Sequence, residues 1–209
     1  MFEIAVIVPC YNSAKTIERC LRSIINQSLD KSLYRIFVID DGSDENLMGY
    51  ISSYKEDFEF IRNGKNIGLP GSLNIGIKAS KAKYIVRVDS DDYVHVDFLK
   101  ILRLKHTLSS NILAAACDYF IVDENESRID EVAAKDYPIG CGIMFNRKIF
   151  DEIGLYNESF MMAEDLEFRK RFSKKFKIDF ISLPLYRYTK HDNNMTNNFS
   201  LHNEFIDKI

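Results

Sequence analysis

The 209-residue sequence lacks several features that would assign it quickly to a class of protein. No apolar run approaches the roughly 20 residues that cross a bilayer, so no membrane-spanning helix is expected. The N-terminal segment Met1-Phe2-Glu3 is not a basic region followed by an apolar one, so no secretory signal is expected. Basic residues do not outnumber acidic ones, and the net charge of −3 gives no general reason to expect nucleic acid as a partner.

The sequence also lacks the CxxC spacing of many zinc sites. Its four cysteines are Cys10, Cys20, Cys117 and Cys141, and three of them lie in apolar surroundings. We therefore expect reduced core thiols in a cytoplasmic protein rather than zinc ligands. Basic clusters at residues 169–171 and 174–175 are typical of a solvated helix face, and peripheral binding to the cytoplasmic membrane is the minority interpretation of them. Nothing in the sequence indicates an oligomeric state.

The first half of the chain predicts a parallel, doubly wound α/β sheet. Apolar, β-branched runs at residues 4–8, 34–39 and 84–88 are typical of strands buried on both faces, and Pro9 is expected to end the first of them. Helical spacing of apolar residues at 17–25 and 69–79 separates these runs. A polar helix over 46–56 and a short strand at 58–61 complete the alternation, which extends through about residue 90.

The second half predicts a smaller mixed region of the same domain. Strands are expected at residues 112–122, 139–145 and 177–188, and helices near 97–108, 148–153 and 164–175. Residues 123–136 form a polar stretch, and the tail from His191 is expected to be a loop or a flexible end. The whole chain is thus expected to be one domain, about residues 1–92 and 93–209, and a truncated second half is one interpretation of its end at Ile209.

The most informative stretch is Asp89-Ser90-Asp91-Asp92, directly after the predicted strand at 84–88. In open α/β sheets, ligands bind at the carboxyl ends of the strands. Carboxylates one residue apart can share a hard divalent cation, which often carries phosphate oxygens as its other ligands. The alternative is a polar turn in which Asp92 caps the helix near residue 97.

Two other predicted strands end in polar residues at the same edge. One is followed by Pro9, Cys10, Tyr11 and Asn12, and the other by Asp40 and Asp41. Tyr11 could stack on a base, Asp41 could accept from a base N–H, and Asp91 could hold a cation between phosphates. Taken singly, Asp-Gly-Ser after Asp40 is good turn chemistry and Tyr11 is an ordinary rim aromatic. Taken together, they predict a nucleoside diphosphate site.

These segments resemble, in order and spacing, the motif series of family 2 glycosyltransferases with the GT-A fold. The resemblance covers about residues 3–190. It is carried by residues 6–12 (VIVPCYN), 38–43 (VIDDGS), 66–76 (NIGLPGSLNIG), 88–92 (VDSDD), 150–154 (FDEIG) and 164–165 (ED). The third segment departs from the family pattern, because Ser72-Leu73-Asn74 has no arginine; Lys65 or Arg87 is the alternative source of positive charge.

The resemblance implies a Rossmann-like, mostly parallel sheet with flanking helices and a role for each motif. The Pro9 backbone, Tyr11, Asn12, Asp41 and Asn66 would bind the nucleoside. Asp89 would lie near the ribose or diphosphate, and Asp91 would ligate Mg²⁺ or Mn²⁺. His191 would be a further metal ligand, or else an exposed histidine of the tail.

Asp165 would be the general base of an inverting transfer to an acceptor hydroxyl, with Glu164 as the alternative. A base within hydrogen-bond reach contributes about 10²–10⁴-fold to such a step. Without the upstream motifs, Glu164 and Asp165 would be read as acids favoured by a helix dipole. The expected donor is a nucleotide sugar, with uridine as the base most usual in the family. The expected acceptor is a saccharide or lipid-linked saccharide in polysaccharide biosynthesis.

Three other classes compete with this interpretation. A nicotinamide dehydrogenase or a sugar nucleotidyltransferase should have a Gly-rich turn after the first strand, and residues 9–12 contain no glycine. A non-catalytic nucleotide-sugar-binding domain would bind nucleotide and metal without sugar transfer.

Overall fold

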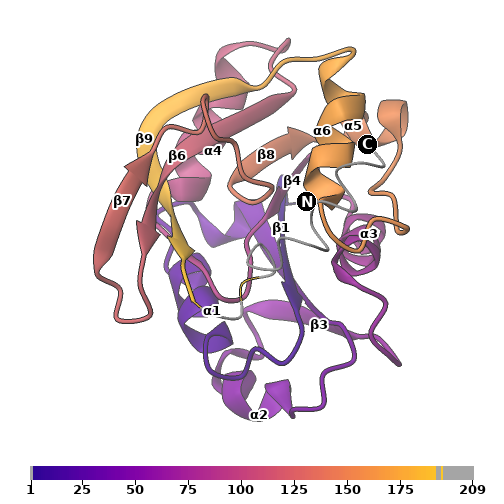
Figure 1. The fold of residues 1–209 in the computed structure, drawn as a ribbon, viewed down its shortest axis with the longest axis vertical. Helices are drawn as coiled ribbons and strands as arrows, with labels where there is room; N and C mark the ends of the chain where they lie inside the picture. The colour runs from indigo at the N-terminus through magenta and orange to yellow at the C-terminus, as the bar shows by residue number, and fades with distance from the viewer. Residues whose placement is uncertain (1, 192–193, 195–209) are drawn as a thin grey trace.

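The structure is a computed structural model that describes residues 2–191 and 194 (Figure 1). Its strands are β1 Ile4–Cys10, β2 Tyr34–Asp40, β3 Phe58–Arg62, β4 Tyr84–Arg87, β5 Tyr93–Val94, β6 Ala114–Val122, β7 Arg128–Val132, β8 Ile143–Asn146 and β9 Asp179–Thr189. Its helices are α1 Ile17–Ile25, α2 Leu47–Ile51, α3 Leu69–Ala79, α4 Phe98–Leu108, α5 Lys148–Ile153 and α6 Glu164–Ser173, with 3₁₀ turns at Lys31–Leu33 and Ser52–Tyr54.

All the described strands belong to one sheet, in the order β3-β2-β1-β4-β8-β6-β9-β5, with β7 paired to β6. The first four strands of this order are parallel, so β1, β2 and β4 end at the same edge. From β8 onward the pairing is mixed: β8 is antiparallel to β4 and β6, whereas β9 is parallel to β6. This is the predicted arrangement, a parallel half followed by a smaller mixed region.

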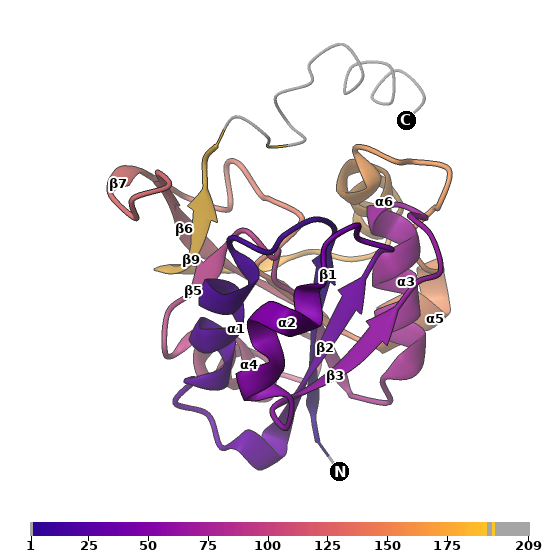
Figure 2. The ribbon, with the colours of Figure 1, turned by 90° about the horizontal axis from the view of Figure 1, so that it is seen from below.

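Helices cover both faces of the sheet (Figures 1 and 2). Helices α1, α2 and α4 lie on one face, and α3, α5 and α6 lie on the other. Alternate residues of β1 supply the two cores: Val6 and Val8 pack with the α1 side, and Ala5 and Ile7 pack with the α3 side. Burial on both faces explains why β1 reads as a continuous apolar run instead of an alternating one.

Several expected boundaries are wrong for identifiable reasons. Pro9 does not end the first strand, because β1 continues to Cys10 and Pro9 pairs in register with Ile39. The β4 ladder has already ended at Ile7, so the missing N–H of Pro9 removes no ladder hydrogen bond. The short strands β5 and β7 were not expected. Residues 128–131 of β7 are exposed, and this strand pairs with β6.

No helix in the described part of the chain is both long and apolar enough to cross a bilayer. The four cysteines are free and buried, as expected.

Candidate functional site

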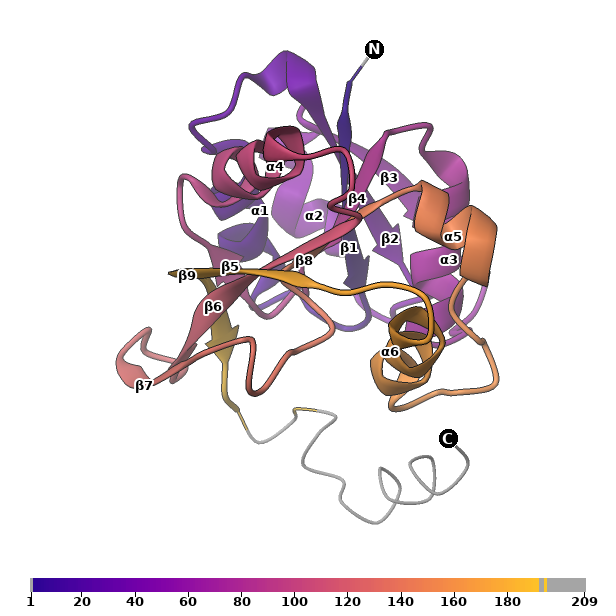
Figure 3. The same ribbon diagram turned by 90° about the horizontal axis from the view of Figure 1, so that it is seen from above.

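The edge at which β1, β2 and β4 end collects most of the residues that the sequence singled out. Figure 3 shows α6 beside this edge, so the chain from residue 164 onward approaches the turns that follow the parallel strands. The Ser13 hydroxyl lies 2.8 Å from the Ser90 hydroxyl, which links the loop after β1 to the turn after β4. The turns after β1, β2 and β4 therefore form one connected layer.

Asp89 in the acidic turn is held by Arg87, the last residue of β4. The Arg87 Nε and Nη2 atoms donate to the two carboxylate oxygens of Asp89 at 2.5 and 2.9 Å. The third guanidinium nitrogen, Nη1, donates to Glu164 at the start of α6 at 2.8 Å. Burial by itself lowers the pKa of Arg87, but the two carboxylates raise it well above its usual value. Arg87 is therefore a buried cation that joins the acidic turn to α6.

Asp92 has a structural role that differs from both sequence interpretations. It does not cap α4, whose N-cap is Asp97. Its two oxygens accept hydrogen bonds from the Tyr186 hydroxyl and the Thr189 N–H, each at 2.7 Å. Burial raises the pKa of Asp92 well above its usual value. Asp92 thus ties the end of β9 to the acidic turn and holds His191, two residues beyond Thr189, close to that turn.

Asp91 faces His191, with 2.8 Å between a carboxylate oxygen and Nε2. Burial, and then the charge of Asp89, raise the pKa of Asp91, while the His191 hydrogen bond opposes them. The Asp91 backbone carbonyl accepts from Arg19 at 2.6 Å, which fixes the peptide. A carboxylate beside an imidazole is a donor set suited to Mn²⁺ or Mg²⁺, so the residues present fit a divalent cation.

Asp89, Asp92 and Cys141 also bring potential ligand atoms within 4.8 Å of one another. The two aspartates already accept from Arg87, Tyr186 and Thr189, as described above. Burial raises the pKa of the Cys141 thiol well above its usual value, so it is protonated at neutral pH and a poor ligand for a hard cation. Asp91 with His191 is the better metal site.

The predicted nucleoside residues surround the ends of β1 and β2. Tyr11 is 48% exposed, as a stacking side chain must be. Asn12 has a left-handed φ of 49°; its N–H donates to Ser43 Oγ at 2.9 Å and its side-chain oxygen accepts from the Asp44 N–H at 2.9 Å. Asn12 therefore holds the two loops together, and this leaves Tyr11 exposed between them.

Asp41 is buried and organises the loop before α3. Its oxygens accept from the Asn63 side chain at 2.8 Å and from the N–H groups of Ile67 and Gly68 at 2.9 and 2.8 Å. The side-chain oxygen of Asn66 accepts from the same Gly68 N–H at 3.0 Å. Two of the three donors bind one Asp41 oxygen, so the other oxygen can accept a further N–H.

The α3 motif lacks arginine but has a clear structural role. Asn74 is buried, and its side chain bonds both the N–H and the carbonyl of Tyr156, at 3.0 and 2.9 Å, and Glu158 at 2.9 Å. The Met161 side chain packs so closely on Gly68 that a Cβ atom there would lie 2.4 Å from its methyl group. The loop before α6 is thus anchored over the loop that Asp41 organises.

Glu164 and Asp165 begin α6 with different surroundings. The Glu164 side chain is 7% exposed and its pKa is raised by burial, against the opposing effect of Arg87. The Asp165 side chain is 22% exposed and lies 3.2 Å from Arg169 one turn later. Ala163, just before the pair, has a left-handed φ of 60°, a conformation that costs about 1 kcal/mol or more in a non-glycine residue.

Gly140 allows Asp165 to approach Arg87. A Cβ atom at Gly140 would lie 2.7 Å from Asp165 Cβ and 3.2 Å from Arg87 Nη1. Asp165, the candidate base, and the acidic turn at residues 89–92 therefore both lie against Arg87.

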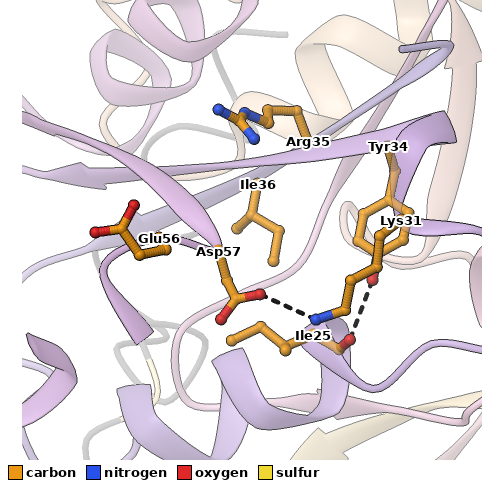
Figure 4. Close-up of a pocket in the computed structure, with 7 residues that line it drawn as sticks. All are labelled: Ile25, Lys31, Tyr34, Arg35, Ile36, Glu56 and Asp57. Carbon is orange, nitrogen blue, oxygen red and sulfur yellow. Dashed lines mark hydrogen bonds and ion pairs between the residues drawn. The ribbon is translucent and has the colours of Figure 1, made fainter. Parts of the chain in front are cut away.

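A separate small hollow of about 110 Å³ lies away from this edge (Figure 4). It is at the start of β2, around Tyr34 and Ile36, whereas Asp41 follows the end of that strand. Lys31 and Asp57 form an ion pair of 3.0 Å across it. It is not part of the candidate site.

Comparison with known proteins assigns the chain to a family. Residues 5–161 match the family described as "Glycosyl transferase family 2", and the chain belongs to that family. It is 38% identical over 96 residues to the poly(ribitol-phosphate) beta-glucosyltransferase of Bacillus spizizenii, which is 44% of this chain and 15% of that protein. It is 29% identical over 154 residues to the cholesterol galactosyltransferase of Borreliella burgdorferi, which is 71% of this chain and 42% of that protein. The chain thus spans less than half of these relatives.

Solved structures show the same fold. TarS of Staphylococcus aureus, residues 1–349 in complex with UDP-GlcNAc, superimposes with a TM-score of 0.78 at 20% identity, over 94% of this chain and 61% of that chain. The mannosyltransferase PcManGT of Pyrobaculum calidifontis, in complex with GDP-Man and Mn²⁺, gives 0.76 at 15% identity, over 98% of this chain and 61% of that chain. The fold is GT-A, as the motif series implied.

Sequence reasoning missed Tyr186 and Thr189 as parts of the site. Tyr186 is 94 residues from Asp92, and no local spacing reports a contact at that distance. Arg87 was considered as a source of charge; its bridging of two carboxylates was not. A charged residue inside a buried strand run was the available signal, because such a residue needs a partner.

Proposed function

We propose that the chain is an inverting glycosyltransferase that moves a sugar from a UDP-sugar to a hydroxyl group of a saccharide, polyol or lipid-linked acceptor in polysaccharide biosynthesis. Membership of glycosyl transferase family 2 supports the reaction class. The name of the Bacillus spizizenii relative, a poly(ribitol-phosphate) beta-glucosyltransferase, supports a polymer hydroxyl as acceptor. The buried free cysteines support a reducing compartment, and we place the enzyme in the cytoplasm.

One observation carries this proposal. Buried Arg87 binds Asp89 in the acidic turn and Glu164 at the start of α6, so the donor-side and acceptor-side carboxylates belong to one cluster. An inverting transfer needs the leaving diphosphate and the attacking hydroxyl held on opposite sides of one sugar carbon. Asp165, next to Glu164, is a partly exposed carboxylate in the same cluster. A module that only binds a nucleotide sugar would have no need for it.

Uridine would bind at the ends of β1 and β2. In our proposal Tyr11 stacks on the base beside the Pro9 backbone, and the Asp41 oxygen with one donor accepts the base N–H. Asn12 and Asn66 hold the surrounding loops through the bonds described above. Asp89, fixed by Arg87, lies near the ribose or diphosphate.

Asp91 and His191 would hold the divalent cation, Mn²⁺ or Mg²⁺. When bound, the cation would stabilise negative charge on the leaving diphosphate. The protein's contribution is to orient these two side chains, through the Arg19 bond to the Asp91 peptide and the Asp92 tether on Thr189.

Asp165 would take the proton of the acceptor hydroxyl as the new glycosidic bond forms. It is the more accessible of the pair, because Glu164 is turned into Arg87. Adjacent residues point about 100° apart on a helix, so both cannot face the acceptor equally.

Asp165→Asn is the test of the base. A residue that acts mainly in the transition state lowers kcat far more than donor affinity, so we expect kcat to fall about 10²-fold or more with UDP affinity within about twofold of wild type. Glu152→Gln, an exposed carboxylate change on α5, is the matched control and should turn over normally. NMR of the product should show inversion of the anomeric centre.

Asp91→Asn is the test of the metal site. It should abolish Mn²⁺-dependent UDP binding in calorimetry and leave the fold intact, whereas Asp136→Asn, at an exposed position, should not. Nucleotide binding by the wild type with no transfer or donor hydrolysis would instead favour a non-catalytic binding domain. Retention of configuration, or normal turnover by Asp165→Asn, would overturn the mechanism.

A further inference from the structure

Beyond the active site, charge is unevenly distributed along the second half of the chain. Residues 166–183 carry six cationic and two anionic side chains, although the whole chain has a net charge of −3. The two anions are already paired: Glu167 with Arg171 at 2.6 Å, and Asp179 with Lys105 at 3.3 Å. Arg169 likewise pairs with Asp165 at 3.2 Å, and exposed lysines, among them Lys174, Lys175 and Lys177, carry the local excess of positive charge.

These cations flank an apolar hollow of about 630 Å³ between α6 and the start of β9. Phe176, Lys177, Ile178 and Phe180 line this hollow, and Lys174 and Lys175 directly precede them in the chain. We call these six residues the α6–β9 patch. The three lysines are exposed, and Phe180 is 36% exposed. An exposed phenylalanine among lysines, at the rim of an apolar hollow, indicates a surface that contacts a partner with both charged and apolar parts.

We propose that the α6–β9 patch binds the surface of an anionic phospholipid bilayer. Lysines attract the phosphate headgroups, while phenylalanine and isoleucine enter the boundary between headgroups and acyl chains. A soluble polyanion would satisfy the lysines but leave the apolar hollow without a partner, so the bilayer accounts for more of the surface. This property goes beyond sugar transfer and does not depend on it.

The patch also lies close to the candidate site. Leu166 and Arg169 line the hollow, and Arg169 contacts Asp165 at 3.2 Å. In Figure 3, α6 lies on the side of the molecule toward which the parallel strands point. Bilayer binding through the patch would hold the start of α6 near the membrane surface, where a lipid-linked acceptor is located.

The test is cosedimentation of the full chain with vesicles, without donor or metal. The wild type should bind mixed phosphatidylcholine–phosphatidylglycerol vesicles and not pure phosphatidylcholine, and high salt should weaken the binding. Lys174→Gln/Lys175→Gln/Lys177→Gln should weaken it about 100-fold, since each lysine near an anionic surface contributes about 5-fold. Phe180→Ser should weaken it further in the same vesicles.

Matched controls separate the patch from general charge and apolarity. Lys78→Gln/Lys81→Gln/Lys100→Gln removes the same charge from exposed positions elsewhere, and Leu108→Ser removes an apolar side chain that is 72% exposed on α4. Both should bind like the wild type, and all variants should keep the wild-type thermal midpoint. The proposal fails if the wild type does not distinguish the two vesicles. It also fails if the patch variants bind normally, or if soluble polyphosphate competes fully while Phe180→Ser has no effect.

Discussion

Arg87 shows how one residue can link two halves of a site. It is the charged member of an otherwise apolar strand, and its three nitrogen donors are all used by Asp89 and Glu164. Its planar fork matches a carboxylate in a way that lysine cannot. The α3 motif lacks the arginine of the family pattern. Leu73 stands in the motif instead and packs in the core.

We expect Arg87→Met to destabilise the fold by about 3–5 kcal/mol, because it leaves the buried Glu164 carboxylate and the partly buried Asp89 carboxylate without their cation. Urea unfolding measures this loss. Arg35→Met, which breaks the exposed pair with Glu59, is the control and should cost less than about 1 kcal/mol. Arg87→Met/Glu164→Gln should recover part of the stability, since one uncompensated charge is then gone. Equal effects of Arg87→Met and Arg35→Met would contradict this role.

Gly140 illustrates a role that depends on the absence of a side chain. We expect Gly140→Ala to push Asp165 away, since the added carbon would lie 2.7 Å from Asp165 Cβ. Because the base is then misplaced, we expect kcat to fall about 10-fold or more, while UDP affinity stays near that of the wild type. Steady-state kinetics with calorimetry measures both. Gly64→Ala, where no atom lies within 4 Å of an added carbon, is the control.

At the scale of elements, the sequence predicted the first and last residues of α3 and α5. It also predicted the bounds of α1 and the helical spacing of its buried apolar residues. Their apolar spacing is local, and Gly154, with a φ of 82°, follows the last residue of α5. Local patterns failed where an element depends on a distant partner, as in β5, which pairs with β9. The same limit applies to the site: the three turns were predicted from strand ends, whereas the Asp92 contacts with Tyr186 and Thr189 depend on how β9 returns to the sheet.

The packing of α4 on β6 and β8 makes stability depend on pH. His106 of α4 is buried between the carbonyls of Ile112 and Met144, each 3.0 Å from a ring nitrogen. Burial lowers its pKa more than the two carbonyls raise it. The unfolded chain takes up this proton as the pH falls through about 6.5, before the folded protein does. The His106 contribution to stability is therefore present above about pH 6.5 and is lost as the pH falls through the lowered folded value.

We accordingly expect the urea midpoint of the wild type to fall more between about pH 7.5 and 5.5 than that of His106→Gln, whose side chain does not titrate. The comparison of slopes isolates His106 even if the variant is less stable at every pH. Parallel slopes for the two proteins would show that the His106 pKa is not lowered.

At the scale of the whole molecule, the loops at the sheet edge are bound mainly to one another. Asn12 binds Ser43, Asp41 binds the loop before α3, and Ser13 binds Ser90. A ligand that contacts all three turns would therefore stabilise the parallel half as a unit. The last strand of this half, β4, pairs with β8, and beyond it Arg87 binds Glu164 of α6 and Asp92 binds β9, so the stabilisation extends into the mixed half.

This coupling leads to a prediction for the intact chain. A ligand that binds only the folded state, at a free concentration about 100 times its Kd, raises the free energy of unfolding by about 2.7 kcal/mol. For a chain of this size, each kcal/mol raises the thermal midpoint by about 2–4 °C. We expect UDP with Mn²⁺ to raise the midpoint by about 5–10 °C, and UDP or Mn²⁺ alone to raise it less. Asp91→Asn should lose the metal-dependent part, and Tyr11→Ala and Asp41→Ala should each reduce the shift with UDP. A larger shift with GDP or ADP than with UDP would reject uridine as the donor base and leave the metal site untouched.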